Sequence, residues 1–341
     1  MKVLVTGGCG FIGSNFILYI LKKRPSARII NLDLLTYAGN RDNLRGIERY
    51  PNYRFVRVDI ADRKVVSGIF SEGIDVVVNF AAESHVDRSI ENVAPFLRTN
   101  VLGMQNLMEE ARSRKVERFI HISTDEVYGS ISGKRKFRED HPIAPNSPYS
   151  ASKAAADVIA RAYFTTYRFP VIITRSSNNY GPYQFPEKFI PLLVTNAFQR
   201  KPLPIYGDGL YVRDWLYVED NCEAILRIME EGRAGEIYNI GGGCEKKNID
   251  VAKAILKITG RDRSLLKFVT DRPGHDRRYA IDFSKIRKEL GWKPAISFDE
   301  GLKRTIVWYK RNEPWWRRIM SGDYLVDRRA ARKHRKNIRT K

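Results

Sequence analysis

Short apolar runs alternate with longer segments of helical periodicity through the first half of the chain. Six runs of four or five residues are rich in valine and isoleucine and are bounded by polar residues or glycine, as buried strands are. They cover Val3–Thr6, Ile29–Leu32, Phe55–Val58, Val76–Phe80, Phe119–Ser123 and Val171–Thr174. Helical periodicity between them covers Ile12–Lys23, Arg63–Phe70, Val86–Arg112 and Tyr149–Tyr167. The alternation predicts an α/β fold with a doubly wound parallel sheet.

The rhythm changes after about residue 176, where prolines divide the chain into short pieces. These are Pro182, Pro186, Pro191, Pro202 and Pro204. Further along, the pattern predicts a helix, a strand and two more helices, over 219–231, 236–240, 249–259 and 298–311. We therefore expect a sheet domain over 1–176, which some later elements can rejoin, and a smaller lobe over 177–316. The charged segment 317–341 has little apolar periodicity and is expected to be a loosely held basic tail.

Composition supports a folded core and leaves the role of the positive charge open. Hydrophobic residues make up 43% of the chain, which excludes wholesale disorder. The 60 lysines and arginines outnumber the 39 acidic residues, so the net charge is +21. Ten basic and two acidic residues place +8 of this in the last 25 residues. Such a charge suits a nucleic acid, an acidic membrane surface or a phosphorylated small molecule, and composition does not choose among them.

The cysteines and the apolar runs exclude several classes of protein. Cys9, Cys222 and Cys244 are too few and too scattered for a disulfide framework or a zinc site, so no metal is expected. No apolar run approaches the roughly 20 residues that a membrane helix needs. Glycines follow the first strand before a signal-peptide core could develop. We expect a reduced, cytoplasmic protein outside the membrane.

A glycine motif follows the first predicted strand and opens the first helix. It reads Gly7-Gly8-Cys9-Gly10-Phe11-Ile12-Gly13. Glycines at this spacing allow a tight turn and a close approach to a pyrophosphate, which the helix N-terminus attracts. Alone, the motif could be an ordinary strand–helix turn. Asp33 ends the second strand, where an acid can bind both ribose hydroxyls and repel a 2′-phosphate. Together they predict a Rossmann-type domain that binds NAD rather than NADP.

Small and acidic residues also follow later strand ends, at the sheet edge where parallel α/β proteins bind ligands. Asp59-Ile60 could meet an adenine ring, and the small residues of Phe80–Ser84 would let the backbone approach the cofactor. Each segment could equally be a small-residue loop. The cofactor contacts that we expect are Gly7, Gly10, Phe11, Ile12, Gly13, Asp33, Thr36, Asp59, Ile60, Phe80, Ala81, Ala82, Ser84, Thr99, Tyr149, Lys153 and Asn179.

Tyr149 and Lys153 stand four residues apart, on one face of the helix predicted over 149–167. A free phenol has a pKa of about 10, but a nearby ammonium and a positive nicotinamide both favour the phenolate. Lowering that pKa by about 3 units takes about 4 kcal/mol. Tyr149 could then take a proton from an alcohol whose hydride passes to NAD. The same spacing is common on ordinary amphipathic helices, so the glycine motif is what favours catalysis.

Thr124-Asp125-Glu126 follows the strand predicted over 119–123, again at a carboxyl end. Thr124 could hydrogen-bond the substrate alcohol beside the tyrosine. Two adjacent carboxyl groups suggest further proton transfers, with one group as acid and the other as base. A simple dehydrogenase or epimerase does not need such a pair. The alternative is a helix cap or a surface Asp-Glu pair.

These motifs resemble the extended short-chain dehydrogenase/reductases that act on nucleotide sugars, and more narrowly the 4,6-dehydratases among them. The resemblance runs from Met1 to about Trp316. Besides Tyr149 and Lys153, it rests on segments 7–15, 81–89, 123–129, 175–184, 186–191, 207–209, 213–215, 245–248 and 271–279. The glycine loop and the Tyr/Lys pair are typical of the whole superfamily, whereas the Thr-Asp-Glu, Lys-Lys-Asn and Asp-Arg-Pro-Gly-His segments are narrower signals. The resemblance also implies a homodimer, formed through helices 86–112 and 149–167.

The resemblance implies dTDP-glucose as substrate, oxidised at C4, dehydrated across C5 and C6, and reduced at C6 to a 4-keto-6-deoxy sugar. Tyr149, with Lys153, would take the C4 hydroxyl proton, while Thr124 holds the sugar. Glu126 would remove the C5 proton, and Asp125 would protonate the leaving C6 hydroxyl. Fork-like guanidinium donors suit a diphosphate, although an arginine alone could be a solvated surface charge. The implied substrate contacts are Ser84, Thr124, Asn178, Lys188, Phe189, Pro204, Tyr206, Arg213, Asn248, Arg272 and His275.

Two other interpretations stay open on the sequence. A 4-epimerase, or a dehydratase of UDP-, GDP- or CDP-linked sugars, would share the cofactor and the tyrosine. The carboxyl pair argues against the epimerase, and the nucleobase stays undecided. A nucleic-acid-binding protein on a dinucleotide fold would use the basic tail, but no aromatic interleaving or nucleic-acid motif accompanies it. We therefore expect nucleic acid not to be the primary partner.

Overall fold

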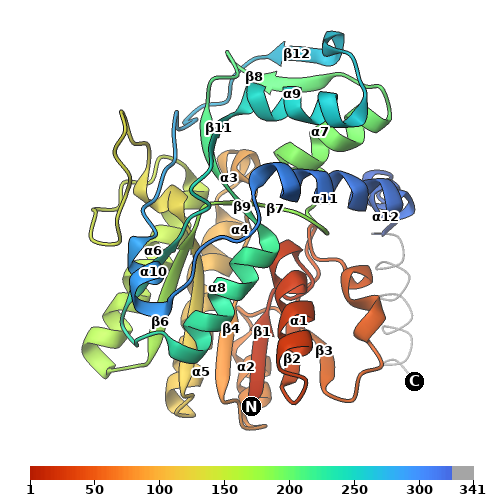
Figure 1. Cartoon of the computed structure of the whole chain (residues 1–341). Helices are drawn as coiled ribbons and strands as arrows, with labels where there is room; N and C mark the ends of the chain where they lie inside the picture. The colour runs from red at the N-terminus through yellow and green to blue at the C-terminus, as the bar shows by residue number, and fades with distance from the viewer. Residues whose placement is uncertain (325–341) are drawn as a thin grey trace.

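A seven-stranded parallel sheet forms the centre of the computed structural model, which describes residues 1–324 (Figure 1). The strand order is β10-β6-β5-β4-β1-β2-β3. The predicted doubly wound sheet is therefore confirmed, and the order changes direction between β1 and β4, where such folds bind ligands. The strands are β1 (Lys2–Thr6), β2 (Arg28–Asp33), β3 (Tyr53–Arg57), β4 (Val76–Asn79), β5 (Arg118–Thr124), β6 (Val171–Ser176) and β10 (Ile237–Ile240).

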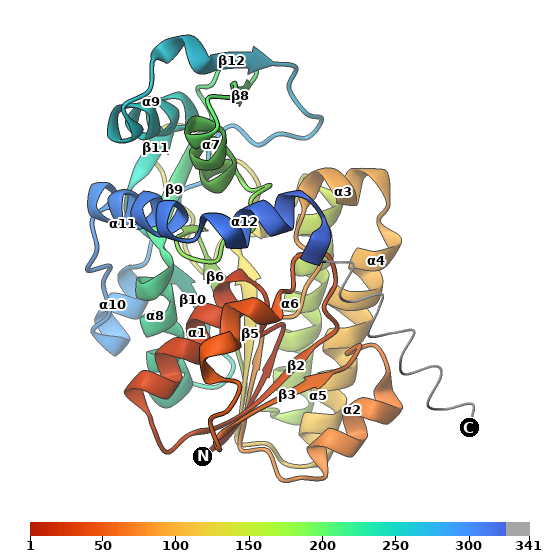
Figure 2. The same cartoon turned by 90° about the vertical axis from the view of Figure 1, so that its right-hand side faces the viewer.

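Helices cover both faces of the sheet, because alternate residues of each buried strand point to opposite sides (Figure 2). Val3 and Val5 face α1 (Phe11–Lys23), α8 (Val218–Glu231) and α10 (Ser284–Leu290). Leu4, between them, faces the core under α2 (Arg63–Phe70), α5 (Met104–Ser113) and α6 (Pro148–Tyr167). The two layers hold the carboxyl ends of the strands at one rigid edge.

The single helix predicted over 86–112 is broken in the structure. Asn92 has an extended backbone (φ −153°, ψ 108°), and its side chain accepts the Ala94 N–H at 3.2 Å. Pro95 then fits the first turn of the next helix. This local hydrogen bonding overrides the apolar periodicity. The pieces are α3 (Val86–Glu91), α4 (Ala94–Phe96), the π-helical turn η2 (Leu97–Gly103) and α5.

The later elements form a smaller lobe beyond the carboxyl ends of the sheet, at the top of Figure 1. It contains a three-stranded sheet, β11-β9-β7, and a two-stranded sheet, β12-β8. β10 instead joins the main sheet, pairing parallel with β6.

The remaining elements among residues 1–324 are η1 (Arg41–Ile47), η3 (Asp125–Tyr128), β7 (Asn178–Tyr180), α7 (Phe189–Phe198), β8 (Leu203–Tyr206), β9 (Val212–Tyr217), β11 (Glu245–Lys247), α9 (Asn248–Thr259), η4 (Arg263–Leu265), β12 (Leu266–Val269), α11 (Phe298–Arg311) and α12 (Glu313–Met320).

The start of the predicted basic tail is packed, which differs from the expectation of a loose segment from residue 317. Ile319 and Tyr324 are buried, and the Tyr324 hydroxyl donates to the Tyr37 carbonyl at 2.6 Å. Arg318 pairs with Asp42 at 3.0 Å. A few apolar residues within a basic segment were enough to dock it. Residues 325–341 of the predicted tail lie outside the described residues. Within residues 1–324, no helix has the length and apolar character to cross a membrane.

Candidate active site

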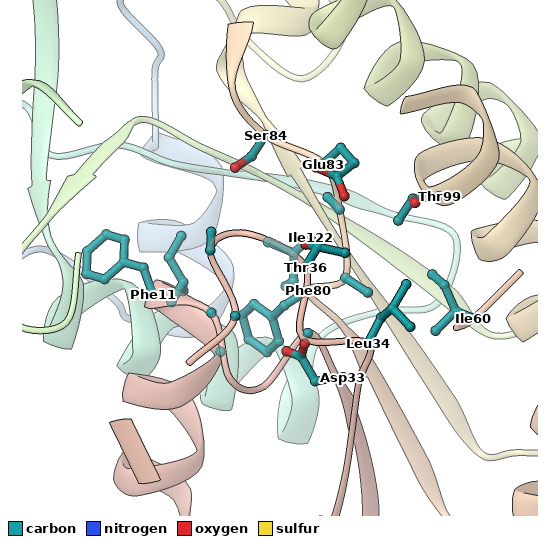
Figure 3. Close-up of a pocket in the computed structure, with 18 of the residues that line it drawn as sticks. Phe11, Asp33, Leu34, Thr36, Ile60, Phe80, Glu83, Ser84, Thr99 and Ile122 are labelled. Atoms are coloured by element: carbon teal, nitrogen blue, oxygen red, sulfur yellow. The ribbon is translucent and has the colours of Figure 1, made fainter. Parts of the chain in front are cut away.

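A cavity of about 240 Å³ lies at the carboxyl ends of the central strands. Figure 3 shows Phe11 on one side of it, Ile60 and Thr99 on the other, and Asp33 and Ser84 at opposite ends of the view. Every predicted cofactor contact except Asn179 lines this cavity. The other lining residues are Leu32, Leu34, Ala38, Gly39, Val58, Glu83, Ile122, Ser123, Gln184, Phe185 and Lys188.

The glycine loop leaves room for a ligand at the N-terminus of α1. Gly7 has φ +67°, and a Cβ there would lie 2.6 Å from the Ala81 nitrogen. A Cβ on Gly13 would lie 2.4 Å from the Gly7 oxygen, so this position needs glycine for helix packing. A Cβ on Gly10 would meet only the Gly7 oxygen, at 3.2 Å, and otherwise enter the cavity. The missing side chain and the helix N-terminus fit a pyrophosphate.

Asp33 is oriented by the backbone at the end of β2. Its Oδ2 accepts the Cys9 N–H at 2.9 Å, and its Oδ1 accepts the Leu35 N–H at 2.7 Å. These bonds favour the carboxylate form, which suits two ribose hydroxyls and repels a 2′-phosphate. The cavity, the glycine loop and this carboxylate therefore fit NAD.

Asn179 is not among the residues that line the cavity. It belongs to β7, its side-chain Nδ2 donates to the Ser177 carbonyl at 2.9 Å, and its own carbonyl accepts from Gln184 at 2.9 Å. Gln184 lines the cavity. A contact between Asn179 and the cofactor therefore stays a prediction, with Gln184 as the nearer group.

The start of α6 presents Tyr149 and Lys153 to the cavity. Ser147 and Ser150 form a capping box, and Pro148 takes the first helical position, so the helix begins one residue before Tyr149. Lys153 lies one turn further and is 4% exposed. Its Nζ donates to the Ile122 carbonyl at 2.6 Å. Both side chains line the cavity, as expected from their spacing.

The electrostatics of Tyr149 differ from the expected lowering of its pKa. Burial raises that pKa above 10, the charge of Glu126 raises it further, and a hydrogen bond from Thr124 opposes both. Burial also lowers the pKa of Lys153 to about 8, while Asp157 acts in the opposite direction. The protein groups alone therefore hold Tyr149 as a phenol, and its phenolate needs added positive charge, such as a nicotinamide.

Thr124, Asp125 and Glu126 lie where β5 passes into η3, and the Thr124 hydroxyl accepts the Glu126 N–H at 3.3 Å. Asp125 is 2% exposed. Burial raises its pKa well above the usual value, and Glu126 and Asp214 raise it further. Burial also raises the pKa of Glu126, but Arg272, Arg213 and Lys188 all lower it. The pKa of Glu126 is still raised overall, and Arg213 acts on both groups. The largest charge effects come from acids at Asp125 and from cations at Glu126.

The three cations around Glu126 come from different elements of the smaller lobe and are held by specific contacts. The Arg213 guanidinium stacks 4.3 Å from the Tyr279 ring. Arg272 lies 3.3 Å from Asp87, and the Lys188 Nζ donates to the Ser84 carbonyl at 2.9 Å. Arg213 Nη2 and Arg272 Nε are buried without a hydrogen-bond partner among residues 1–324. Unsatisfied buried guanidinium groups suit an anionic ligand.

Other predicted substrate contacts surround the same end of the lobe. Asn178 and Asn248 each bury a side-chain oxygen that has no hydrogen-bond partner in the described part of the chain. His275 stacks on Tyr211 with ring centroids 3.8 Å apart, and Tyr206 lies edge-on to it at 6.0 Å. Phe189 stacks on Trp215, and Pro204 lies in β8 opposite Lys267 of β12.

Several residues of the site were not identified from the sequence. Glu83, Gln184 and Phe185 line the cavity. Tyr279 lies under Arg213, and Asp157 lies under Lys153, in contact with Arg175. The spacing of Lys153 and Asp157, four residues apart in one helix, is a signal that could have found Asp157. Tyr279 has no comparable local signal, because its role depends on a distant arginine.

Comparisons with known proteins agree with this geometry. A family model described as GDP-mannose 4,6 dehydratase matches residues 4–305. dTDP-glucose 4,6-dehydratase of Xanthomonas campestris is 49% identical, covering 95% of this chain and 97% of that protein. Low-salt glycan biosynthesis protein Agl12 of Haloferax volcanii is 52% identical, covering 91% and 98%.

A solved structure shows the same likeness in three dimensions. The dTDP-glucose 4,6-dehydratase DesIV of Streptomyces venezuelae, crystallised with NAD bound, is 50% identical and superposes with a TM-score of 0.91. The match covers 94% of this chain and all of that one. Fold and sequence agree over nearly the whole length. This chain therefore belongs to the dTDP-glucose 4,6-dehydratase family within the extended short-chain dehydrogenase/reductases.

Proposed function

We propose that this protein is an NAD-dependent lyase that converts dTDP-glucose to dTDP-4-keto-6-deoxyglucose. The observation that carries the proposal is the contrast between Asp125 and Glu126 beside Tyr149. An elimination needs one group that gives a proton and one that takes a proton at the same pH. Acidic neighbours around Asp125 and cations around Glu126 supply this difference.

The chain would hold the cofactor through the glycine loop and Asp33. When bound, NAD supplies the hydride acceptor and donor for the sugar, and none is consumed overall. Gly7, Gly10 and Gly13 leave space for the pyrophosphate, and the carboxylate of Asp33 receives the ribose hydroxyls. Lys153, fixed at the Ile122 carbonyl, keeps positive charge beside Tyr149.

Tyr149 and Thr124 would act on the C4 hydroxyl. Thr124 lies at the end of β5, close enough to Tyr149 to lower its pKa, so one hydroxyl of a sugar can be held by both side chains. Tyr149, as phenolate, accepts the C4 hydroxyl proton while C4 becomes a ketone. The ketone makes the neighbouring C5 proton acidic.

Glu126 and Asp125 would then eliminate water across C5 and C6. Glu126 remains a carboxylate among three cations and takes the C5 proton. The C6–O bond breaks as Asp125 gives its proton to the C6 hydroxyl, which leaves as water. A C5=C6 double bond remains. Reduction at C6 would return the hydride removed from C4, while Glu126 gives its proton back to C5 and so ends as a carboxylate. Tyr149 then holds the proton of the C4 hydroxyl and Asp125 lacks the proton lost with water, so one proton must pass from Tyr149 to Asp125, through solvent, between turnovers.

The substrate's diphosphate would lie against Arg213 and Arg272. Both guanidinium groups have buried donors without a partner among residues 1–324, and both lower the pKa of Glu126. The same cations therefore serve binding and catalysis. The names of the relatives favour a thymidine nucleotide, and a UDP-linked sugar is the second candidate. A 4-epimerase is less supported, because epimerisation leaves the carboxyl pair without a task.

The assembly is proposed to be a homodimer in the cytoplasm. Four exposed apolar side chains lie on α3, η2 and α6, and α6 contacts both of the other elements. They are Ile90, Leu97, Leu102 and Val158. Burying such a patch against a second copy would remove it from water. The three cysteines are free thiols, which supports a reducing compartment.

The proposal is tested by incubating the purified protein with dTDP-glucose and, separately, with UDP-glucose. We expect dTDP-glucose to lose one water by mass spectrometry, with no stoichiometric accumulation of reduced cofactor. Faster dehydration of UDP-glucose would change the substrate but not the reaction. An epimerised sugar without water loss would show that the assignment as a dehydratase is wrong.

A further inference from the structure

A buried charge cluster lies beneath the Tyr149–Lys153 pair and takes no part in the reaction described above. Asp157 follows Lys153 by one turn of α6 and is 2% exposed. Its Oδ2 accepts from Arg175 Nε of β6 at 2.8 Å. Its Oδ1 lies 3.6 Å from His121 Nε2 of β5. Asp157 therefore lies between the catalytic helix and the two strands that end at the site.

Asp157 is the anion of this cluster. Arg175 is charged at any relevant pH, and Lys153 carries a second positive charge. His121 is neutral, because burial, Lys153 and Arg175 all lower its pKa. Its other ring nitrogen, Nδ1, faces Asn79 at 3.4 Å. The remaining titratable neighbour is Tyr128, whose ring lies 4.6 Å from the Arg175 guanidinium and whose hydroxyl donates to Asn239. Of the two buried cations, Arg175 forms an ion pair with Asp157 at 2.8 Å, whereas Lys153 interacts with this carboxylate only through longer-range charge.

The environment of Lys153 shows why this carboxylate matters. Its Nζ has only a neutral hydrogen-bond partner in the described structure, the Ile122 carbonyl. Burial of an ammonium favours the uncharged amine. Among residues 1–324, Asp157 is the one charge that acts against this burial, which already brings the pKa of Lys153 to about 8. Without Asp157, Arg175 would be left as an uncompensated cation in the same core.

We propose that Asp157 is a positioning residue that keeps Lys153 in its ammonium form beside Tyr149, with Arg175 competing for the same carboxylate. This inference rests on the proposed function, because it assumes that the charge of Lys153 activates Tyr149. Asp157 touches neither the cavity nor the reacting atoms. It acts only through Lys153.

The proposal predicts a change in the pH dependence of catalysis. In Asp157→Asn the pKa of Lys153 falls below about 8, so the basic limb of the kcat profile moves to lower pH. At the acidic limb Lys153 is still an ammonium in the variant, so this limb should stay near its wild-type position. A nearby opposite charge shifts a pKa by about 1–3 units, so we expect the basic limb to move to lower pH by about one unit.

The measurement is kcat for water loss from dTDP-glucose as a function of pH, from about pH 5.5 to about pH 10 in steps of roughly half a pH unit. A merely structural role would lower kcat by the same factor at every pH. An unmoved basic limb in an active, folded Asp157→Asn variant would overturn the proposal. Absence of product with the wild-type chain would instead mean that the proposed function fails, so the two failures are distinguishable.

Two further variants separate charge from packing. Arg175→Met removes the cation that pairs with Asp157, so the carboxylate acts on Lys153 alone. The basic limb should then stay in place or move to higher pH. A move to lower pH would contradict the proposal. His121→Asn replaces a neutral partner of Asp157 by another neutral group, and both limbs should stay where they are in the wild type. Arg175→Met keeps the proposal testable even if Asp157→Asn does not fold.

Unfolding provides a readout that needs no turnover. Lys153 has a folded pKa of about 8, below the roughly 10.4 of an unfolded lysine, so the unfolded state binds more protons between these values and stability rises with pH there. Asp157→Asn lowers the folded-state pKa of Lys153, so the range in which stability rises with pH extends to below pH 8. The melting temperature of the variant should therefore increase more steeply than that of the wild type between pH 7 and 8. In a Lys153→Met background this difference should vanish, and its persistence would count against the proposal.

Discussion

Asp125 and Glu126 are adjacent in the chain, yet their carboxyl groups meet opposite charges. β5 ends at Thr124, and the tight turn of η3 separates the two side chains. Asp125 is buried and the charge of Asp214 raises its pKa, whereas Arg272, Arg213 and Lys188 lower the pKa of Glu126. Charge at about 4 Å is worth several kcal/mol near a protein surface, so such neighbours can decide which carboxyl holds a proton.

The first prediction concerns these two residues. Asp125→Asn and Glu126→Gln should each slow loss of water by about 10²–10⁴-fold, because each removes a proton donor or acceptor of the elimination. Oxidation at C4 should be affected much less. A single-turnover experiment would follow water loss by mass spectrometry and hydride transfer by the absorbance of the cofactor.

The control for this pair is Asp208→Asn. Asp208 is an exposed carboxylate that pairs with Arg277 at 2.8 Å on the smaller lobe. Its removal should leave both steps at the wild-type rate. If Asp125→Asn or Glu126→Gln abolishes hydride transfer as strongly as water loss, the division of labour between Tyr149 and the carboxyl pair is mistaken.

At the scale of elements, α12 and the residues after it, up to Tyr324, hydrogen-bond to a loop that lines the cofactor cavity. The Trp315 Nε1 of α12 donates to the Asn43 side chain at 3.0 Å, and the Tyr324 hydroxyl donates to the Tyr37 carbonyl at 2.6 Å. One bond reaches the segment between β2 and η1, and the other reaches η1 itself. This segment contributes Thr36, Ala38 and Gly39 to the cavity wall. Figure 2 shows α12 reaching across toward this part of the main domain.

We therefore predict that Trp315→Phe combined with Tyr324→Phe weakens NAD binding. Both changes keep an aromatic ring and remove one hydrogen bond each. Two such bonds contribute roughly 1–3 kcal/mol in total, so we expect the dissociation constant to rise about tenfold. Titration calorimetry with NAD measures this directly.

Arg317→Ala is the matched variant, since Arg317 lies on the same helix and pairs with Glu313 within it. Its affinity for NAD should equal that of the wild type. Wild-type affinity in the double variant would mean that the C-terminal helix only stabilises the fold. These contacts also show that a truncation after Trp316, which removes Arg318, Ile319 and Tyr324, would disturb the packed structure.

At the scale of the whole molecule, the exposed apolar side chains of α3, η2 and α6 form the surface through which we propose that two copies of the chain associate. Leu97 is 49% exposed and Val158 is 56% exposed. Both lie on elements whose inner faces carry the site, because α6 presents Tyr149 and Lys153 to the cavity. Association through this surface would hold the outer side of the catalytic helix.

Leu97→Glu combined with Val158→Glu should therefore convert the proposed dimer to a monomer, because two carboxylates from each copy would be buried without partners. Light scattering after size-exclusion chromatography measures the mass. As controls, Phe268→Glu and Val307→Glu alter exposed apolar residues of the smaller lobe and of α11 and should leave the mass unchanged. A wild-type chain that elutes as a monomer would contradict the dimer.

The net charge of +21 is distributed differently from what the sequence suggested. Arg317 and Arg318, counted at first within the tail, pair with Glu313 and Asp42 in the packed structure. Lys188, Arg213 and Arg272 surround Glu126. Part of the excess positive charge therefore belongs to ion pairs of the fold and to a cationic site that suits an anionic ligand, which weakens the case for nucleic acid as the partner.

The sequence by itself determined the sheet, the cofactor loop and the catalytic spacing. Val3–Thr6 and the later apolar runs are strands because of their own composition, and the glycine loop and the Tyr149–Lys153 pair depend on neighbours only a few residues away. Local patterns of this kind are decided by backbone sterics and periodicity. They failed at Asn92 and after Trp316, where a side-chain hydrogen bond and a few docking contacts outweighed the periodicity.

Only the tertiary structure decided the charges around those residues. Arg213 and Arg272 come from loops and strands far along the chain from Glu126, and Arg175 reaches Asp157 from another strand. Burial and charge at a side chain depend on which distant segments pack against it, and no spacing in the sequence records this. For that reason the sequence predicted which residues could perform the chemistry, while the fold decided which of them carry protons and which carry charge.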